Sequence, residues 1–298
     1  MHHYGNIKIS HKGNDCVTDD LYRGDQFLRG VNKMKKLLLA SAIALAATGQ
    51  AYADYQFEVG AVYTSGEIGS TDYDGFGVGG EFHFDKVDTS KGPLAEASFL
   101  DKSSFVDFSF LSVEPDFPGA DDIESTSIGG RFVTGSNLII EADWATVDTG
   151  ASDVDTIRVG VGTYINDTTD VVVSYSTEDD DNADVDYLDV SLHGVNALNQ
   201  GASVGYDVAI GYIDTDDDSG YQISVGGTYY FNNMFGLGLS ASIADVGDTS
   251  SDGISLDASF FPSEQVEIYA SIFDESVEFD GGGDIDSDGV LIGAAVRF

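Results

Sequence analysis

Cysteine, proline and basic residues are all scarce in this chain of 298 residues. It has one cysteine, Cys16, four prolines, and 13 lysines and arginines against 52 acidic residues. Cys16 precedes an export signal, so the exported chain has no disulfide framework, no thiol nucleophile and no cysteine-based metal site. The shortage of basic residues excludes nucleic acid as a partner, because that affinity rests on Lys and Arg meeting phosphates.

Long apolar runs are also missing after residue 53. A helix that spans a membrane needs roughly 20 apolar residues, and no stretch of the later chain approaches that length. Only helices and closed barrels satisfy their backbone polar groups inside lipid. Any membrane span in this region must therefore be built from strands.

The front of the chain has the pattern of an export signal. From Met34 to Ala53 it reads MKKLLLASAIALAATGQAYA, with two lysines, a short apolar core and a small-x-small site. This pattern is typical of a cleaved signal peptide (34–53), with the mature protein beginning at Asp54. Residues 1–33 are polar and aperiodic, and are either a mis-assigned start or an N-terminal extension. We expect one folded domain over 54–298.

Alternation of apolar and polar residues predicts strands through this domain. For example, Val266, Ile268, Ala270 and Ile272 alternate with Glu267, Tyr269, Ser271 and Phe273. Fourteen such segments can be identified: 55–65, 74–84, 104–113, 122–134, 137–147, 154–165, 169–177, 184–194, 202–213, 220–231, 234–244, 252–261, 264–273 and 288–298. We expect an all-β, transmembrane, antiparallel up-and-down β-barrel of about 14 strands, with 12 or 16 as alternatives. The final alternation stops on an aromatic residue, Phe298, and resembles the last strand of a bacterial outer-membrane barrel.

The connections between these segments are predicted to alternate in length. Short turns lie at one end and acidic connections of seven to fifteen residues at the other, as expected for periplasmic turns and external loops. The connection 85–103 is long although it lies on the periplasmic side. Pro93 can begin a helix there, and Leu94, Ala97 and Leu100 would then share one face. We expect a short periplasmic helix under the pore mouth.

This connection also carries a family resemblance. The stretch VDTSKGPLAEASFL (Val87 to Leu100) is similar to a segment of the outer-membrane porin family of marine gammaproteobacteria. Those proteins share the signal peptide, the acidic loops and the aromatic C-terminus. The resemblance implies a channel barrel and transfers no catalytic residue.

Negative charge dominates the exported chain and is unevenly distributed. From residue 54 onward there are six basic and 48 acidic residues, a net charge of −42. The predicted external loops hold 30 acidic and no basic residues: 66–74, 114–124, 147–155, 177–184, 213–219, 245–252 and 274–288. All three lysines of this domain lie in the periplasmic connection 85–103.

Within the predicted strands, charged residues fall on the face opposite the apolar stripe. That parity makes the following residues pore-lining, with Arg297 also facing inward: Glu58, Glu81, Asp107, Arg131, Glu141, Asp143, Arg158, Asp189, Asp207, Asp257 and Glu267. A low-dielectric wall lined by one sign of charge concentrates ions of the other sign, and acidic rings are a known basis of cation selectivity. The alternative is that the acidic residues only keep the loops solvated.

Other motifs give weaker predictions. Asp284, Asp286 and Asp288 resemble the front of a calcium loop but lack its glutamate at position twelve. They predict either weak Ca²⁺ or Mg²⁺ binding at an external loop or simply a solvated loop, and we expect no other cofactor. The glycine-rich run 75–80 lies inside an alternating strand, which excludes a nucleotide-binding loop.

Histidines and aromatic residues give no sign of an enzyme. Both histidines after residue 53, His83 and His193, share the lumen parity, which argues against a lipid-facing hydrolytic site. Five aromatic residues lie near predicted strand ends, where an aromatic girdle sits, although a sugar slide is the alternative: Phe57, Trp144, Tyr164, Phe231 and Phe260.

We therefore predict a passive outer-membrane porin that prefers cations through its acidic loops and lumen, without enzymatic activity. Its partners would be outer-membrane lipid, lipopolysaccharide, small hydrophilic solutes and cations, and a homo-oligomer is possible. The alternatives are a structural or adhesive barrel with cation-binding loops, and a substrate-specific channel. A folded-in loop, for which 274–288 has the length, would favour the specific channel. A lumen filled by its own side chains would favour the structural barrel.

Overall fold

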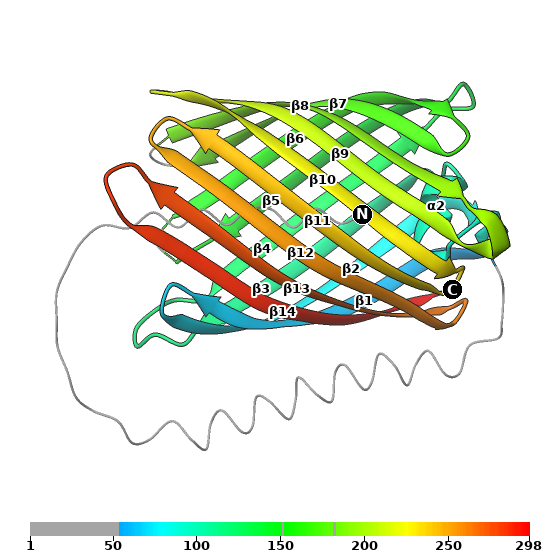
Figure 1. Ribbon diagram of the computed structural model, residues 1–298, viewed down its shortest axis with the longest axis horizontal. Helices are drawn as coiled ribbons and strands as arrows, with labels where there is room; N and C mark the ends of the chain where they lie inside the picture. The colour runs from blue at the N-terminus through cyan, green and yellow to red at the C-terminus, as the bar shows by residue number, and fades with distance from the viewer. Residues whose placement is uncertain (1–53, 151, 181–182) are drawn as a thin grey trace, which may run out of the picture. The chain divides into compact units, whose positions relative to one another are not determined.

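The computed structural model describes residues 54–150, 152–180 and 183–298, which form a closed barrel of fourteen antiparallel strands (Figure 1). The strands are β1 (Tyr55–Ile68), β2 (Thr71–Val87), β3 (Phe105–Pro115), β4 (Ile123–Val133), β5 (Leu138–Asp148), β6 (Asp153–Asn166), β7 (Thr169–Asp180), β8 (Ala183–Ala197), β9 (Ser203–Thr215), β10 (Ser219–Asn232), β11 (Phe235–Val246), β12 (Thr249–Ser263), β13 (Val266–Phe279) and β14 (Asp284–Arg297). Each pairs with its neighbours in sequence, and β1 pairs with β14 to close the sheet. The predicted all-β up-and-down barrel of about 14 strands is confirmed. The expected signal peptide with Ala53, and the stretch 1–33, lie outside the described residues.

The two-residue period of the sequence sorts side chains between the two faces of the barrel wall. Phe57 and Val59 of β1 are 44% and 52% exposed on the outside. Glu58, between them, lies opposite Glu81 of β2 on the inside. The same alternation runs through the other strands and gives an apolar outer face and a polar inner face. Such a wall suits lipid outside and water inside.

The first residue of β1 departs from this alternation. Strict parity predicts Tyr55 on the apolar face with Phe57, but the register of β1 on β2 shifts between these two residues. Tyr55 is instead 3% exposed and packs with Val87 and Ala97. A bulge inserts one extra residue and so reverses the parity beyond it, which a two-residue period cannot foresee.

The strands are longer and the external connections shorter than the sequence predicted. Between strands the far connections span only 69–70, 116–122, 149–152, 181–182, 216–218, 247–248 and 280–283. The expectation of loops of seven to fifteen residues is therefore wrong for all but 116–122, and the predicted loop 274–288 is mostly strand. A tilted strand of 14 residues rises about 35 Å, against an apolar band of about 25 Å. The acidic residues lie on strand ends that project beyond the band, where both faces are polar and alternation gives no signal.

The connection between β2 and β3, residues 88–104, is here named the insert. It contains three short helical elements, η1 (Thr89–Lys91), η2 (Leu94–Glu96) and α2 (Ala97–Leu100). The predicted shared face is confirmed, because Leu94, Ala97 and Leu100 are all buried. A Cβ on Gly92 would lie 2.5 Å from Leu100 Cδ1, so glycine lets η1 and α2 pack closely. Among the described residues, no helix is long and apolar enough to cross a membrane.

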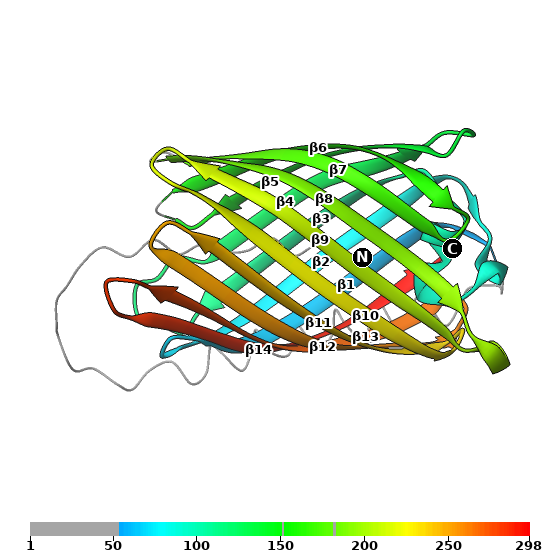
Figure 2. The same ribbon diagram turned by 45° about the horizontal axis from the view of Figure 1, so that its top comes forward.

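The insert lies at the end of the barrel that also holds the C-terminus (Figures 1 and 2). We call this the terminal end and the opposite one the far end. The 3-10 turn η3 (Asn199–Gly201), which joins β8 to β9, lies at the terminal end as well. Short turns make the other connections there.

Candidate functional site: the barrel lumen and its insert

The strand register places all eleven residues that the sequence predicted as pore-lining on the inner face of the wall. Glu58, Glu81 and Asp107 illustrate this, because they face one another across β1, β2 and β3. The apolar residues that flank Asp107, Val106 and Phe108, are 43% and 48% exposed on the outside. The charged set therefore lines the inside of the barrel, and its contacts decide what the lumen can do.

Two inner arginines are held in a ladder of ion pairs on the wall from β4 to β7. Arg131 of β4 donates to Glu141 of β5 at 3.1 Å and also pairs with Asp170 of β7. Arg158 of β6 donates to Glu141 at 3.0 Å and to Asp143 at 2.9 Å. Glu141 is thus shared by two guanidinium groups. This part of the wall contributes little net negative charge to the lumen.

A row of carboxylates adjoins the ladder. Register places Glu58 opposite Glu81, Glu81 opposite Asp107, and Asp107 opposite Gly129 of β4, which faces Asp143 of β5. A Cβ on Gly129 would touch both Asp107 Oδ1 and Asp143 Oδ1, so these two carboxylates lean over the glycine from either side. We call Glu58, Glu81, Asp107 and Asp143 the acidic arc.

Arg297 connects the seam between β1 and β14 to the insert. It is 5% exposed, its Nε donates to Glu58 at 2.5 Å, and its Nη2 lies 3.7 Å from Glu267 of β13. Its Nη1 donates to the Leu94 carbonyl of the insert at 2.8 Å. The guanidinium also lies 4.8 Å from the centroid of the Tyr55 ring. One cation therefore compensates two wall carboxylates and holds the insert.

Glu96 of the insert contacts the wall at β8 and β10. Its Oε1 accepts a hydrogen bond from the Tyr230 hydroxyl at 2.5 Å, and its Oε2 lies 3.1 Å from His193 Nε2. His193 Nδ1 in turn lies 2.6 Å from Asp207 Oδ1 on β9. Burial alone would raise the pKa of Glu96, but the hydrogen bond and charge of His193, with the Tyr230 hydroxyl, hold that pKa below its usual value.

The second histidine anchors the end of the insert. His83 Nδ1 is hydrogen-bonded to the Ser103 hydroxyl at 2.8 Å, and His83 Nε2 lies 2.8 Å from Glu81 Oε1. Serine, histidine and glutamate occur in this order in hydrolytic triads. Here, however, His83 has no exposed surface and Ser103 is 8% exposed, which leaves no room for a substrate. We interpret this relay as a structural anchor.

The inner wall is exposed in its middle and covered at the terminal end. Ser109 of β3 and Ser242 of β11 face inward and are exposed. Near the insert, inward-facing Val172 of β7 is 3% exposed. Across the terminal end, the Tyr164 hydroxyl of β6 donates to the Phe99 carbonyl of the insert at 2.8 Å. The lumen is thus an aqueous space whose terminal end is covered by the insert.

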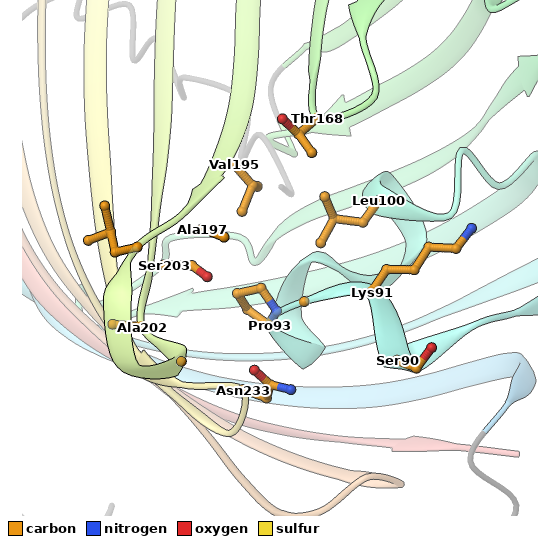
Figure 3. Close-up of a pocket in the computed structure, with 13 residues that line it drawn as sticks. Ser90, Lys91, Pro93, Leu100, Thr168, Val195, Ala197, Ala202, Ser203 and Asn233 are labelled. Atoms are coloured by element: carbon orange, nitrogen blue, oxygen red, sulfur yellow. The ribbon is translucent and has the colours of Figure 1, made fainter.

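A cavity of about 250 Å³ remains beside the insert (Figure 3). Pro93 and Leu100 of the insert line one side of it, and Val195 of β8 and Ala202 of the β8–β9 connection line the other. The flank of the insert that faces β8 and β9 is therefore not tightly packed. This contrasts with the opposite flank, where Tyr55 contacts Ala97 directly.

The three aspartates of the calcium-like motif lie on a strand and not in a loop. Asp284, Asp286 and Asp288 occupy alternate positions of β14, on the same face as Val290, which is 43% exposed on the outside. Alternate residues on one face are about 7 Å apart along a strand. Among the residues that the structure describes, no group of three or more His, Cys, Asp and Glu side chains is placed to hold a metal ion.

Periodicity missed or misplaced three side chains of this site. Asp170 is 2% exposed and inward, and the alternation of β7 carried the signal for it. Glu96 lies in irregular chain, where no period applies. Tyr164, expected in an aromatic girdle, instead faces inward and is 5% exposed. The other four predicted girdle residues are exposed on the outside: Phe57, Trp144, Phe231 and Phe260.

A closed, antiparallel barrel with an apolar outside and a polar, wetted inside is the fold of an outer-membrane channel. A family model described as "putative general bacterial porin" matches residues 34–211, more than half of the chain, and the chain belongs to this family. The protein is thus an outer-membrane channel protein. The first strand begins and the last strand ends at the terminal end, the arrangement expected of a barrel whose terminal end faces the periplasm.

Solved structures show the same fold. The outer-membrane protein Omp33 of Acinetobacter baumannii is 20% identical with a TM-score of 0.56, over 82% of this chain and 99% of that chain. A bacterial polysaccharide outer-membrane secretin is 9% identical with a TM-score of 0.51, over 82% and 99% of the two chains. No curated protein sequence matches the chain.

Proposed function

We propose that the protein is a passive diffusion channel for small hydrophilic solutes that prefers cations over anions. The observation that carries this proposal is the acidic arc. Its four carboxylates occupy neighbouring positions across β1 to β5. The two arginines that adjoin it, Arg297 and Arg158, lie at its two ends, and the buried His83 contacts Glu81. A wall of one sign in a low-dielectric barrel raises the local concentration of counter-ions.

The rest of the charge distribution supports the same preference. The far end, through which external ions would enter, carries acidic residues on nearly all its strand ends, and every lysine of the barrel domain lies at or near the insert. Inner arginines are compensated by the ladder and by Glu58 and Glu267. Cations would therefore meet an attractive potential from the mouth to the middle of the lumen.

A closed structural barrel is the second candidate function. The observation in its favour is the insert, which covers the periplasmic end of the lumen. On this alternative the acidic arc would never carry ions, whatever its charge. The two candidates differ in whether ions cross the folded barrel.

Reversal potentials across a planar bilayer test the proposal. We would record the parent protein and a variant in which residues 88–103 of the insert are replaced by a short Gly–Ser turn, here named the insert-shortened barrel, under a tenfold KCl gradient. Such a turn can join β2 to β3, because Phe84 N already donates to Ser104 O at 3.0 Å. We expect a reversal potential whose sign indicates cation selectivity. Its magnitude should be below the limit of about 59 mV for an ideally selective channel under a tenfold gradient.

The arc is tested by removing its charge in the insert-shortened barrel. The double variant Glu81→Gln, Asp107→Asn should move the reversal potential toward zero. The control Glu264→Gln, at an exposed glutamate of the β12–β13 turn, should leave it unchanged. A reversal potential whose sign indicates anion selectivity would refute the cation preference. An arc variant with the same reversal potential as its parent would refute it as well. Absence of conductance from a folded, insert-shortened barrel would favour the structural candidate.

A further inference from the structure

The insert is fastened to the barrel wall at several places, and the fastenings differ in chemical kind. At its β2–β3 base, the contacts are the His83–Ser103 hydrogen bond and the packing of Ala97 on Tyr55. On the side toward β8 to β10, Glu96 is the charged attachment. Beside it, the Leu94 N–H donates to the Asn233 carbonyl at 2.8 Å, and the Phe99 ring lies 4.2 Å from the His193 ring. An apolar contact and a charged contact respond differently to the loss of a single charge.

The wall is shaped to receive Glu96. A Cβ on Gly205 of β9 would lie 3.4 Å from Glu96 Oε1 and 3.3 Å from the Tyr230 ring, so the glycine leaves room for both side chains. Tyr230 and His193 then contact one carboxylate oxygen each. The Glu96 side chain is only 13% exposed in this position. The carboxylate thus fits a recess built from three strands.

Charge strengthens this contact. His193 lies between two carboxylates, Glu96 at 3.1 Å and Asp207 at 2.6 Å. The neighbouring β7 position is Asp170, which Arg131 already compensates. A charge-assisted hydrogen bond is roughly twice as strong as a neutral one. Loss of the Glu96 charge would therefore remove the charge-assisted part of the attachment on this side and leave the Leu94–Asn233 backbone hydrogen bond.

The cavity beside the insert lies on the same side as Glu96. It separates Pro93 and Leu100 from the β8–β9 connection (Figure 3), so these two side chains leave that flank of the insert loosely packed. With Glu96 detached, this flank has both the weakest attachment and the space to shift. The base at β2 and β3 remains tethered by its own contacts.

We propose that Glu96, held by His193 and Tyr230, is the latch that keeps the insert across the periplasmic mouth, and that its release opens the barrel. The proposal rests on the channel function proposed above, and specifies which contact controls it. Opening is then a swing of the β8–β10 flank of the insert about its β2–β3 base. Glu96 acts as a positioning residue and does not itself select ions.

Two readouts test the latch in the full-length barrel. The first is the open probability of single channels in KCl for the parent, Glu96→Gln, and the control Glu264→Gln, which alters an exposed glutamate of the β12–β13 turn. The second is maleimide labelling in a Leu100→Cys background, since the chain from residue 54 has no cysteine. Leu100 is 7% exposed while the insert is seated. Heat-modifiable migration on gels confirms that each barrel is folded.

We expect Glu96→Gln to raise both open probability and labelling rate at least tenfold, a change of about 1.4 kcal/mol, with Glu264→Gln unchanged. Values within twofold of the parent in both readouts, while the insert-shortened barrel conducts, would overturn the latch and leave the channel intact. If the folded insert-shortened barrel does not conduct, the channel function fails, and labelling alone then decides whether Glu96 holds the insert.

Discussion

Arg297 makes a strong prediction about stability, because one nearly buried cation serves three partners. Replacing it by glutamine removes the charge that compensates Glu58 and Glu267, whose side chains are only 20% and 14% exposed. It also removes the donor to the Leu94 carbonyl. Two carboxylates would then share a poorly solvated corner beside the seam between β1 and β14.

The size of the effect follows from the burial of these groups. Breaking a buried ion pair by removing one partner costs about 3–5 kcal/mol, because the remaining charge is left uncompensated. The partial exposure of the two glutamates admits some water and favours the lower part of this range. We expect Arg297→Gln to lower the free energy of unfolding by about 3 kcal/mol, with Arg297→Lys intermediate because lysine keeps the charge but not the fork of donors.

The assay is urea unfolding in lipid vesicles, followed by fluorescence of Trp144. It is the sole tryptophan of the chain, lies on the outer face of β5 and is 40% exposed. Arg158→Gln is the comparison, because its side chain is 33% exposed and should cost less. Adding Glu58→Gln and Glu267→Gln should recover part of the loss. A cost below about 1 kcal/mol for Arg297→Gln, or one equal to that of Arg158→Gln, would refute the reasoning.

Two further predictions concern acidic residues at opposite ends of the barrel. Glu67 of β1 lies directly between carboxylates of β2 and β14 at the far end. Glu67→Lys should therefore stabilise the barrel by about 0.5–1 kcal/mol in the same urea assay at low salt. A loss of stability, or a gain in stability that persists at high salt, would contradict this. The lowered pKa of Glu96 means that its stabilisation of the seated insert is present at neutral pH and is lost as the pH falls through that pKa. Open probability should therefore rise in the parent as the pH falls below the ordinary glutamate pKa of 4.5, and rise less in Glu96→Gln. A rise on the alkaline side alone would exclude this role of Glu96.

Much of the fold was predictable because a membrane barrel imposes a strict local rule. Each strand must alternate between lipid and water, so the residues around Asp107 and Arg158 revealed their faces without knowledge of their neighbours. The rule fails where the wall no longer separates lipid from water. The strand extensions around Asp274 and Asp288 lie beyond the apolar band, both faces are wet, and the sequence resembled a loop. At Tyr55 a single bulge reversed the parity.

The insert was predicted in part for a related reason. Pro93 and the spacing of Leu94, Ala97 and Leu100 indicated a helical segment with one buried face, and these side chains are buried. The sequence could not predict which wall the segment meets. Glu96 contacts Tyr230 over a separation of 134 residues, and Arg297 contacts Leu94 over 203. Only the closed barrel brings these positions together.

Register is the missing information, and the seam shows how the chain itself specifies it. Parity places Arg297 inward, but a slip of β14 by two residues along β1 would also keep it inward and would set it opposite Gly60 instead of Glu58. Backbone hydrogen bonds cannot distinguish these two pairings. The slipped pairing, however, would leave Glu58 without its cation in a nearly buried corner, at a cost of about 3 kcal/mol or more. The ion pair across the seam therefore selects the register in which the barrel closes, and the same guanidinium then holds the insert only when that register is correct.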